Sequence, residues 1–253
     1  MGNRHGGPEQ GGVAPTVITV VGEEYAAILA QTGWLAGTPA DFQSAILAAS
    51  LVSRRQAGQP LYHSGDAVGG MFGVCQGAIE IATPLGNPDA NIVHIGQPGF
   101  WFGAGPALTG VARRITVVAR TDCVFAHLPL SAIQRMTSNR PEWWRHIGAL
   151  AVQNMQIAIG AAADLLIRDH ERRCIAVLLR LSGARYEESA PVEGLSAEVS
   201  QAELAAMAHL SRNAAGAVLR RLADRRLIEL GYRAIAVRSP DRLRAMVDAP
   251  VEV

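Results

Sequence analysis

The chain has 253 residues, of which 49% are hydrophobic and 18% are charged, and its formal net charge is +1. This composition supports a sizeable core, allows one or two domains and excludes a wholly disordered chain. No uninterrupted apolar run reaches the roughly 18 residues of a membrane-spanning helix. Residues 1–16 are Gly-rich and polar and lack a secretory apolar segment, so we expect a flexible tail and a cytoplasmic protein.

The three cysteines, Cys75, Cys123 and Cys174, are far apart in the sequence and form no CxxC pair. An odd, scattered set is poorly suited to a disulfide framework or to a four-cysteine metal site. We therefore expect neither a bound metal nor a cofactor.

The N-terminal part combines helices with a series of short strands. Residues 17–34 are mostly apolar and predict a helix, and Thr38 as N-cap with Pro39 in the first turn predicts the start of another. Short apolar or alternating runs then follow, separated by Gly, Pro, Asn and Asp, at residues 73–75, 78–81, 92–95, 115–118 and 123–125. This pattern predicts a small all-β sandwich or barrel.

Residues 141–166 predict one long, Ala-rich helix, because apolar side chains recur from Ile147 to Leu166 at helical spacing. Two such helices could pair between subunits, or one could pack on the β domain of its own chain. A hinge is expected near Arg168, followed by a helix that ends at Leu181.

The strongest local signal is a pair of helix starts near the C-terminus. Ser200 and Glu203 form the S-x-x-E pattern of a capping box, and Ser211 can cap a second helix over residues 212–225. Two helices joined by a short turn indicate a helix-turn-helix. His209 stands where such a turn usually has Gly, so it would hold a positive φ at some cost.

The end of the chain is strongly basic, and every basic residue of the chain is Arg. Residues 209–244 contain nine Arg and three acidic residues, a local charge of +6. Such a patch predicts binding to a polyanion, here double-stranded DNA. A solvated helix face or a helical hairpin that only packs is the alternative.

In this interpretation the second helix enters the major groove with its N-terminus first. Arg212 pairs with guanine and Asn213 with adenine, while a hairpin over residues 228–237 brings Arg233 to the DNA backbone. The residues expected at DNA are Ser200, Gln201, Ser211, Arg212, Asn213, Ala217, Arg220, Arg221 and Arg233.

Several motifs occur in a fixed order along the chain. Residues 61–66 read Leu-Tyr-His-Ser-Gly-Asp, residues 72–77 predict a strand closed by Gly77, and residues 99–103 read Gly-Phe-Trp-Phe-Gly. The long helix and the helix-turn-helix with its hairpin follow. With these motifs in this order, residues 34–240 resemble the bacterial cyclic-AMP receptor and fumarate–nitrate reduction (Crp/Fnr) regulators.

The resemblance implies an α+β fold with a cyclic-nucleotide-binding-like β-roll (jelly roll), a long dimerisation helix and a C-terminal winged helix-turn-helix. It implies a homodimeric transcription regulator that binds a palindromic DNA site, with half-sites about one helical turn apart, and that contacts RNA polymerase. The expected division is a tail at 1–16, the sensor domain at 17–139, the dimerisation helix at 140–167, the DNA-binding domain at 168–245 and a tail at 246–253.

The motif that binds the nucleotide in this family is altered here. Where members that bind cyclic AMP have a Glu for the ribose, this chain has Ala104. Arg113 is retained for a phosphate, but Arg114 and Ile115 replace small residues, and the long helix has Ala158 and Ile159 where hydroxyls reach the adenine. Each lost buried hydrogen bond costs about 1–3 kcal/mol, so we expect that cyclic AMP is not the effector. The expected pocket residues are Gly103, Ala104, Arg113, Arg114, Ile115, Ala158 and Ile159.

The occupant of the altered pocket stays open. Trp101 and Phe102 are expected nearby. The two arginines suit the head group of an amphiphilic acid or a modified nucleotide. Alternatively, they form structural ion pairs, and the regulator is constitutive. No Cys precedes residue 75, which argues against the iron–sulfur members. Two interpretations of Cys75 remain: it ligates haem together with His63 or His94, or it is a small buried apolar residue without a ligand.

The sequence contains no HExxH, Walker A or GxSxG motif, so we do not expect an enzyme. A redox switch at Cys123 or Cys174 lacks an evident group that would stabilise a thiolate. The alternative to a DNA-binding regulator is a sensor or scaffold protein that acts through protein contacts and keeps a structural helix-turn-helix.

Overall fold

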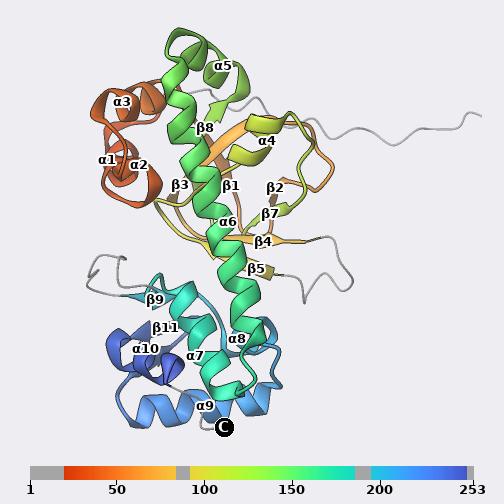
Figure 1. Cartoon of the computed structure of the whole chain (residues 1–253), viewed down its shortest axis with the longest axis vertical. Helices are drawn as coiled ribbons and strands as arrows, with labels where there is room; N and C mark the ends of the chain where they lie inside the picture. The colour runs from red at the N-terminus through yellow and green to blue at the C-terminus, as the bar shows by residue number, and fades with distance from the viewer. Residues whose placement is uncertain (1–19, 84–91, 186–194, 250–253) are drawn as a thin grey trace, which may run out of the picture.

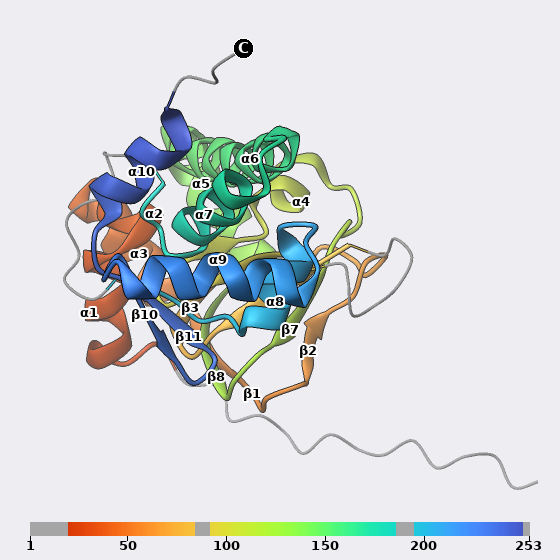
Figure 2. The ribbon, with the colours of Figure 1, turned by 90° about the horizontal axis from the view of Figure 1, so that it is seen from below.

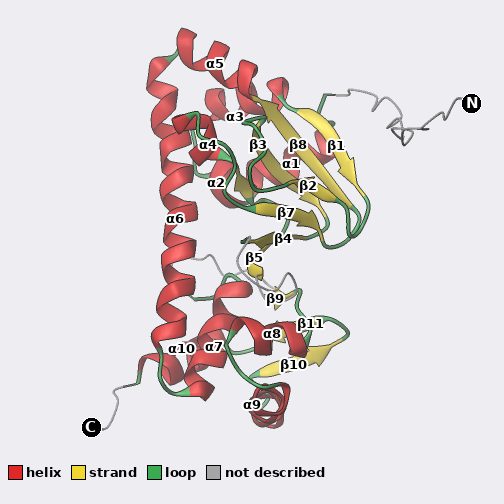
Figure 3. Cartoon of the chain, turned by 90° about the vertical axis from the view of Figure 1, so that its right-hand side faces the viewer, coloured by secondary structure: helices red, strands yellow, loops and turns green. Residues whose placement is uncertain are grey.

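The computed structural model describes residues 20–83, 92–185 and 195–249. A β-rich N-terminal half lies at the top of Figure 1 and a mostly helical C-terminal half lies below it. One long helix, α6 (Trp144–Leu166), runs past both halves (Figures 1 and 3). The fold class is α+β, as the sequence predicts.

The N-terminal half is built on two antiparallel four-stranded sheets, with strand orders β1-β8-β3-β6 and β2-β7-β4-β5. Their strands are β1 (Leu51–Arg55), β2 (Pro60–Tyr62), β3 (Gly70–Gln76), β4 (Ile79–Ala82), β5 (Ile92–Gly96), β6 (Trp101–Phe102), β7 (Thr116–Ala119) and β8 (Cys123–Pro129). Each of the five strands expected from the sequence overlaps one of these. The two sheets form the β-roll.

Strand β3 is buried on both faces, which explains its continuous apolar character. Phe72 and Val74 lie in the core between the sheets. Met71 and Cys75 lie in a second core, which the flanking helices cover. Every residue of β3 except Gln76 is therefore buried.

The helices around this second core are α1 (Glu23–Gln31), α2 (Gly33–Ala36), α3 (Ala40–Ala49), α4 (Ala104–Thr109), α5 (Leu130–Asn139) and the 3-10 turn η2 (Pro141–Trp143). The single helix expected over 17–34 is wrong: residues 17–19 lie outside the described residues, and Thr32, with extended φ and ψ of −131° and 150°, separates α1 from α2. Aromatic rings fill the core, with the rings of Trp34 and Phe42 5.8 Å apart.

The expected cap of α3 is also wrong. Its N-cap is Pro39, and no side chain caps it. The Thr38 hydroxyl instead donates to the carbonyl of Leu35 at 2.7 Å and so serves the end of α2. Because α3 begins one residue later than expected, the Thr38 side chain does not stand at the capping position.

Helix α6 has one buried and one exposed apolar face. Ile147 and Leu150 pack into the core of the N-terminal half. The exposed face carries Val152, Met155, Ile159, Leu165 and Leu166. The sequence has no uninterrupted apolar run of membrane-spanning length, yet the helix over 141–166 is long enough to cross a membrane, and an 18-residue window of it has a mean hydropathy of 1.3. A single helix of this kind is weak evidence for a membrane, and both halves of the chain pack against α6.

The C-terminal half contains α7 (His170–Leu181), β9 (Ser196–Ala197), α8 (Gln201–Met207), α9 (Arg212–Asp224), β10 (Ile228–Gly231), β11 (Ala234–Val237) and α10 (Pro240–Asp248). Strands β10, β11 and β9 form a small antiparallel sheet. Residues 186–194, between α7 and β9, lie outside the described residues. Helix α10 continues past residue 245, and Val247 is buried.

Both helix starts expected in the helix-turn-helix are confirmed. Ser200 and Glu203 form a complete capping box on α8. The Ser211 hydroxyl accepts a hydrogen bond from the backbone N–H of Ala214 at the start of α9. The turn between them contains His209 with φ at 55°, as expected from the missing Gly.

A buried ion pair joins α6 to α7. The Asp164 carboxylate on α6 accepts a hydrogen bond from Arg180 Nε on α7 at 2.8 Å, and the side chains are 4% and 7% exposed. Arg180 also donates to the carbonyl of Val93 on β5 at 3.4 Å. Burial tends to raise the pKa of Asp164, and the two nearby arginines, Arg180 and Arg185, oppose that effect. Arg180 therefore contacts both the Asp164 carboxylate of α6 and the backbone of β5, so the ion pair lies where three elements from both halves meet.

We expect Asp164→Asn to lower the free energy of unfolding by about 3–5 kcal/mol, because it leaves the buried Arg180 without a counter-charge. Urea unfolding followed by circular dichroism measures this change. Asp241→Asn is the matched control: its side chain is 87% exposed, so a loss within about 0.5 kcal/mol is expected. Equal losses in the two variants would contradict the structural role of the pair.

We expect His209→Gly to raise the free energy of unfolding by about 0.5–1 kcal/mol, because Gly removes the strain of a left-handed residue but loses more entropy on folding. Thermal unfolding measures the change. His209→Ala keeps a Cβ at the same φ and should give no gain. A gain as large in the Ala variant would show that the φ is not the cause.

Candidate DNA-binding surface and effector pocket

Helix α9 lies at the outer end of the C-terminal half and faces the viewer when the molecule is seen from below (Figure 2). Its inner side is buried through Ala215, Val218 and Leu222. Arg212 and Asn213 lie in its first turn and are exposed. No described carboxylate pairs with Arg212, so its guanidinium is available to a ligand outside the protein.

The other residues expected at DNA lie around this helix, and they differ in whether their side chains are exposed or already bonded within the protein. Gln201 and Arg220 are exposed and lie close to Gly216: a Cβ built there would be 4.0 Å from the Gln201 Oε1 atom and 3.6 Å from the Arg220 Nη1 atom. The hydroxyls of Ser200 and Ser211 are already used as helix caps. Ala217 is half-buried.

Two of the expected arginines contact the protein itself. Arg221 pairs with Glu171 of α7 at 2.5 Å. Arg233, at the tip of the hairpin, lies 3.4 Å from a carboxylate oxygen of Glu203. Arg233 has a φ of 52° in the turn between β10 and β11. Both arginine side chains are exposed to solvent, so these two ion pairs are weak.

Glu203 connects the helix-turn-helix to the β-roll. Its carboxylate accepts the backbone N–H of Ser200 at 2.8 Å and the guanidinium of Arg120, between β7 and β8, at 2.6 Å. The Arg120 side chain is 5% exposed and also lies 3.7 Å from Glu80. Partial burial opposes the charge on Glu203, but these hydrogen bonds outweigh it and lower its pKa to about 2.

A large cavity of about 1130 Å³ lies between the β-roll, α6 and the helix-turn-helix. Six of the seven residues expected in the pocket line it: Gly103, Ala104, Arg113, Arg114, Ile115 and Ala158. Ile159 does not, because one step along α6 turns its side chain to the exposed face, where it is 58% exposed. Trp101 is buried in the core instead, with its ring 5.6 Å from that of Trp34. Phe102 lines the cavity, as expected.

Arg113 is the charged group most deeply buried in the cavity wall. It is 3% exposed, and its Nη2 donates to the carbonyl of Gly70 at 2.9 Å. Its guanidinium lies 3.9 Å from the centre of the Tyr62 ring and 5.5 Å from that of Phe72. Its Nη1 has no hydrogen-bond partner, and no described carboxylate pairs with it. The alternative interpretation, in which Arg113 forms a structural ion pair, therefore finds no partner for it among the described residues.

Sequence reasoning missed several residues of the cavity wall. Tyr62 and His94 come from β2 and β5, and Met207 and Leu210 come from the helix-turn-helix. Burial raises the pKa of Tyr62 to about 12 and lowers that of His94 to about 4, so both are neutral near pH 7. No local pattern could have placed them together, because they meet only through the packing of distant elements.

The three cysteines are free and buried. Burial raises the pKa of the Cys75 and Cys174 thiols to about 12 and also raises that of Cys123. These thiols are therefore protonated near pH 7, which disfavours reactions that need a thiolate. Within the described ranges, no group of three or more His, Cys, Asp or Glu side chains is arranged for a metal ion.

Comparisons with known proteins agree with this architecture. Residues 53–140 match the cyclic nucleotide-binding domain family, and residues 172–246 match the Crp-like helix-turn-helix domain family. The cAMP-activated global transcriptional regulator CRP of Pasteurella multocida is 21% identical over 178 residues, which cover 70% of this chain and 85% of that protein.

Solved structures show the same fold. FixK2 of Bradyrhizobium japonicum has a TM-score of 0.65 at 17% identity, with 80% of this chain and 99% of that chain covered. The c-di-GMP responsive global regulator CLP of Xanthomonas campestris has a TM-score of 0.57 at 22% identity, with 79% and 99% covered. With the two domains matched in this order around a long helix, the chain belongs to the Crp/Fnr family and is a DNA-binding transcription regulator of that type.

Proposed function

We propose that this regulator binds a palindromic DNA site as a homodimer and that Arg212 and Asn213 read its bases. The observation that carries the proposal is the exposed first turn of α9, in which Arg212 has no described carboxylate partner. We assign the sensor domain to 17–139 and the dimerisation helix to 140–167. The DNA-binding domain begins at 168 and, because α10 ends at Asp248, extends beyond the expected boundary at 245. RNA polymerase is the expected protein partner, and the cytoplasm is the expected location.

The exposed face of α6 supports the homodimer. Val152, Ile159 and Leu166 recur at intervals of seven residues, do not line the cavity and are each about half exposed or more. A contiguous apolar patch on a folded chain usually marks an interface. Pairing two copies of this face would bury the patch and place two α9 helices in one assembly.

We expect Ile159→Asp to convert a dimer into a monomer, because each copy would bury a carboxylate in an apolar interface. Sedimentation velocity measures the change. Val20→Asp is the matched control, since Val20 is also an exposed apolar residue, 55% exposed, but lies outside α6. A wild-type monomer, or an Ile159→Asp dimer as stable as the control, would disprove pairing along this face.

Cyclic AMP is not the proposed effector. The cavity has Ala104 and Ala158 at two positions where nucleotide-binding members supply polar groups, and none of its lining residues is acidic. The regulator is either constitutive or responds to another ligand. A ligand would act by shifting a pre-existing equilibrium between DNA-competent and DNA-incompetent arrangements of the two halves. A constitutive regulator needs no ligand and already has the DNA-competent arrangement.

The test is selection from a random duplex pool with ligand-free protein at about 150 mM salt, where phosphate contacts alone are weak. Enrichment of a palindrome supports a regulator that binds without an effector. If nothing is enriched, the selection is repeated in the presence of dodecanoate and of dodecyl phosphate. Failure in both conditions would favour the alternative, a scaffold with a structural helix-turn-helix.

We expect Arg212→Ala to weaken binding to the selected site by about 1–3 kcal/mol and to relax the choice of base at one position of each half-site. Fluorescence anisotropy with the selected duplex and its single-base variants measures both effects. Arg135→Ala, an exposed change on α5 in the N-terminal half, should leave both unchanged. An equal loss at every duplex would show that Arg212 contacts only phosphates.

A further inference from the structure

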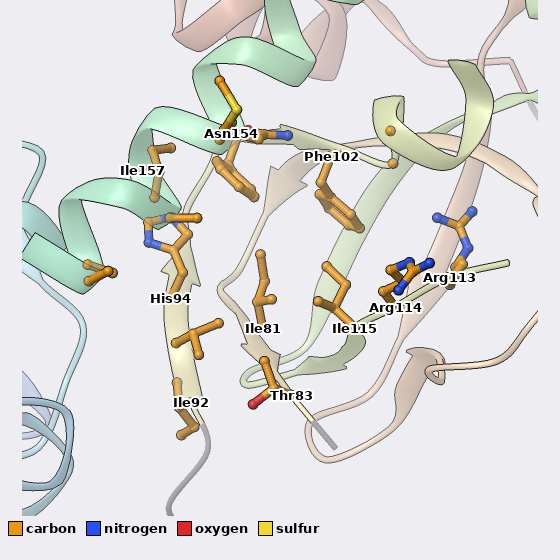
Figure 4. Close-up of a pocket in the computed structure, with 18 of the residues that line it drawn as sticks. Ile81, Thr83, Ile92, His94, Phe102, Arg113, Arg114, Ile115, Asn154 and Ile157 are labelled. Carbon is orange, nitrogen blue, oxygen red and sulfur yellow. The ribbon is translucent and has the colours of Figure 1, made fainter. Parts of the chain in front are cut away.

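The cavity is polarised from one end to the other. Arg113 and Arg114 lie at one end, and Ile92, His94 and Ile157 lie toward the other (Figure 4). None of the residues that line the cavity is an Asp or Glu. The charge at the arginine end is therefore not balanced from within the cavity wall.

Arg113 has the features of a buried cation that lacks its counter-ion. Arg113 is 3% exposed; its guanidinium donates to the carbonyl of Gly70 and lies over the rings of Tyr62 and Phe72, and no described carboxylate pairs with it. The free Nη1 atom lies beside Gly103, since a Cβ on Gly103 would be 3.2 Å from it. Buried charges are normally paired, and a guanidinium suits a carboxylate or a phosphate. This end of the cavity therefore fits an anionic head group.

The rest of the wall is long and mostly apolar. Its polar members are Thr83, His94, Thr109, Asn154, His209 and Arg180, and Arg180 is already paired with Asp164. The wall follows α6 from Ala151 to Leu165, which is about 21 Å of helix at 1.5 Å per residue. Opposite α6 lie apolar side chains of the β-roll, namely Ile81, Ile92, Phe100, Phe102 and Ile115. An elongated apolar body matches this wall better than a nucleoside, whose polar groups would remain unpaired.

The far end of the cavity reaches the DNA-binding half. Met207, His209 and Leu210, at the end of α8 and in the turn before α9, line it. The backbone of this turn is also held by Arg173, whose Nε donates to the carbonyl of Ala208 at 2.7 Å. A ligand that fills the cavity would therefore contact the arginines and the helix-turn-helix at once.

We propose that the cavity binds an amphiphilic anion, with a carboxylate or phosphate head at Arg113 and Arg114 and an unbranched apolar chain that runs along α6 to the helix-turn-helix. The inference rests on the proposed function only in giving this ligand a regulatory effect on α9. The binding itself is a property of the cavity and can be measured without DNA.

The experiment is isothermal titration calorimetry of the full-length protein with dodecanoate, below the concentration at which it forms micelles. The matched probes are dodecanol, which lacks the charge, dodecyltrimethylammonium, which reverses it, and acetate, which lacks the chain. We expect dodecanoate to bind at least tenfold more tightly than each of them. Dodecyl phosphate is compared with dodecanoate, and the tighter of the two identifies the head group.

Two variants test the arginine end. Arg113→Gln should weaken dodecanoate about 10- to 100-fold, the range for losing a hydrogen bond to a charged group. Arg114→Ala should weaken it at least threefold and, as an exposed change, keeps the test valid if the buried variant does not fold. Arg135→Ala is the control and should leave the affinity unchanged.

Equal affinity for dodecanol and dodecanoate, or unchanged affinity in Arg114→Ala, would overturn the proposal. So would micromolar binding of cyclic AMP that Arg113→Gln abolishes, because the cavity would then be a nucleotide site. DNA selection is read separately, so a failure to enrich a palindrome leaves a positive calorimetric result intact, and the reverse also holds.

Discussion

The position of the DNA-binding half depends on one buried carboxylate. Asp164 lies near the end of α6, where it accepts a hydrogen bond from Arg180 of α7, and Arg180 also contacts β5 of the β-roll. A buried ion pair contributes little net stability, because both charges lose their hydration. Its contribution is geometric: the carboxylate and the guanidinium face each other in this arrangement of α6 and α7, and turning either helix away would leave both charges buried without a partner.

The elements that were correctly predicted are those whose signals are local. The alternation in β4 and β5 and the caps at Ser200 and Ser211 depend on residues a few positions apart, so they could be identified from the sequence. The cap at Thr38 was wrong because α3 begins one residue later, with Pro39 as its N-cap, and the Thr38 hydroxyl donates to the carbonyl of Leu35 in α2 instead. The local pattern does not fix the first residue of a helix to within one position.

The pocket was predicted only in part for a similar reason. Arg113 and Arg114 follow from a motif, but one position along α6 separates Ala158, which lines the cavity, from Ile159, which is exposed. The side chain rotates by about 100° at each step of a helix, so an error of one residue changes the face. The wall formed by Met207 and Leu210 depends on how the two halves pack, and no periodicity within either half contains that information.

Glu203 illustrates how a local signal and a long-range contact can share one side chain. It closes the capping box of α8, pairs with Arg120 of the β-roll and lies near Arg233 of the hairpin. Gln at this position would keep the cap but lose the charge, and Asp is one methylene shorter than the side chain that spans both contacts. The choice of amino acid at position 203 is therefore narrower than helix capping alone would require, and substitutions there are constrained by a residue 83 positions away in the chain.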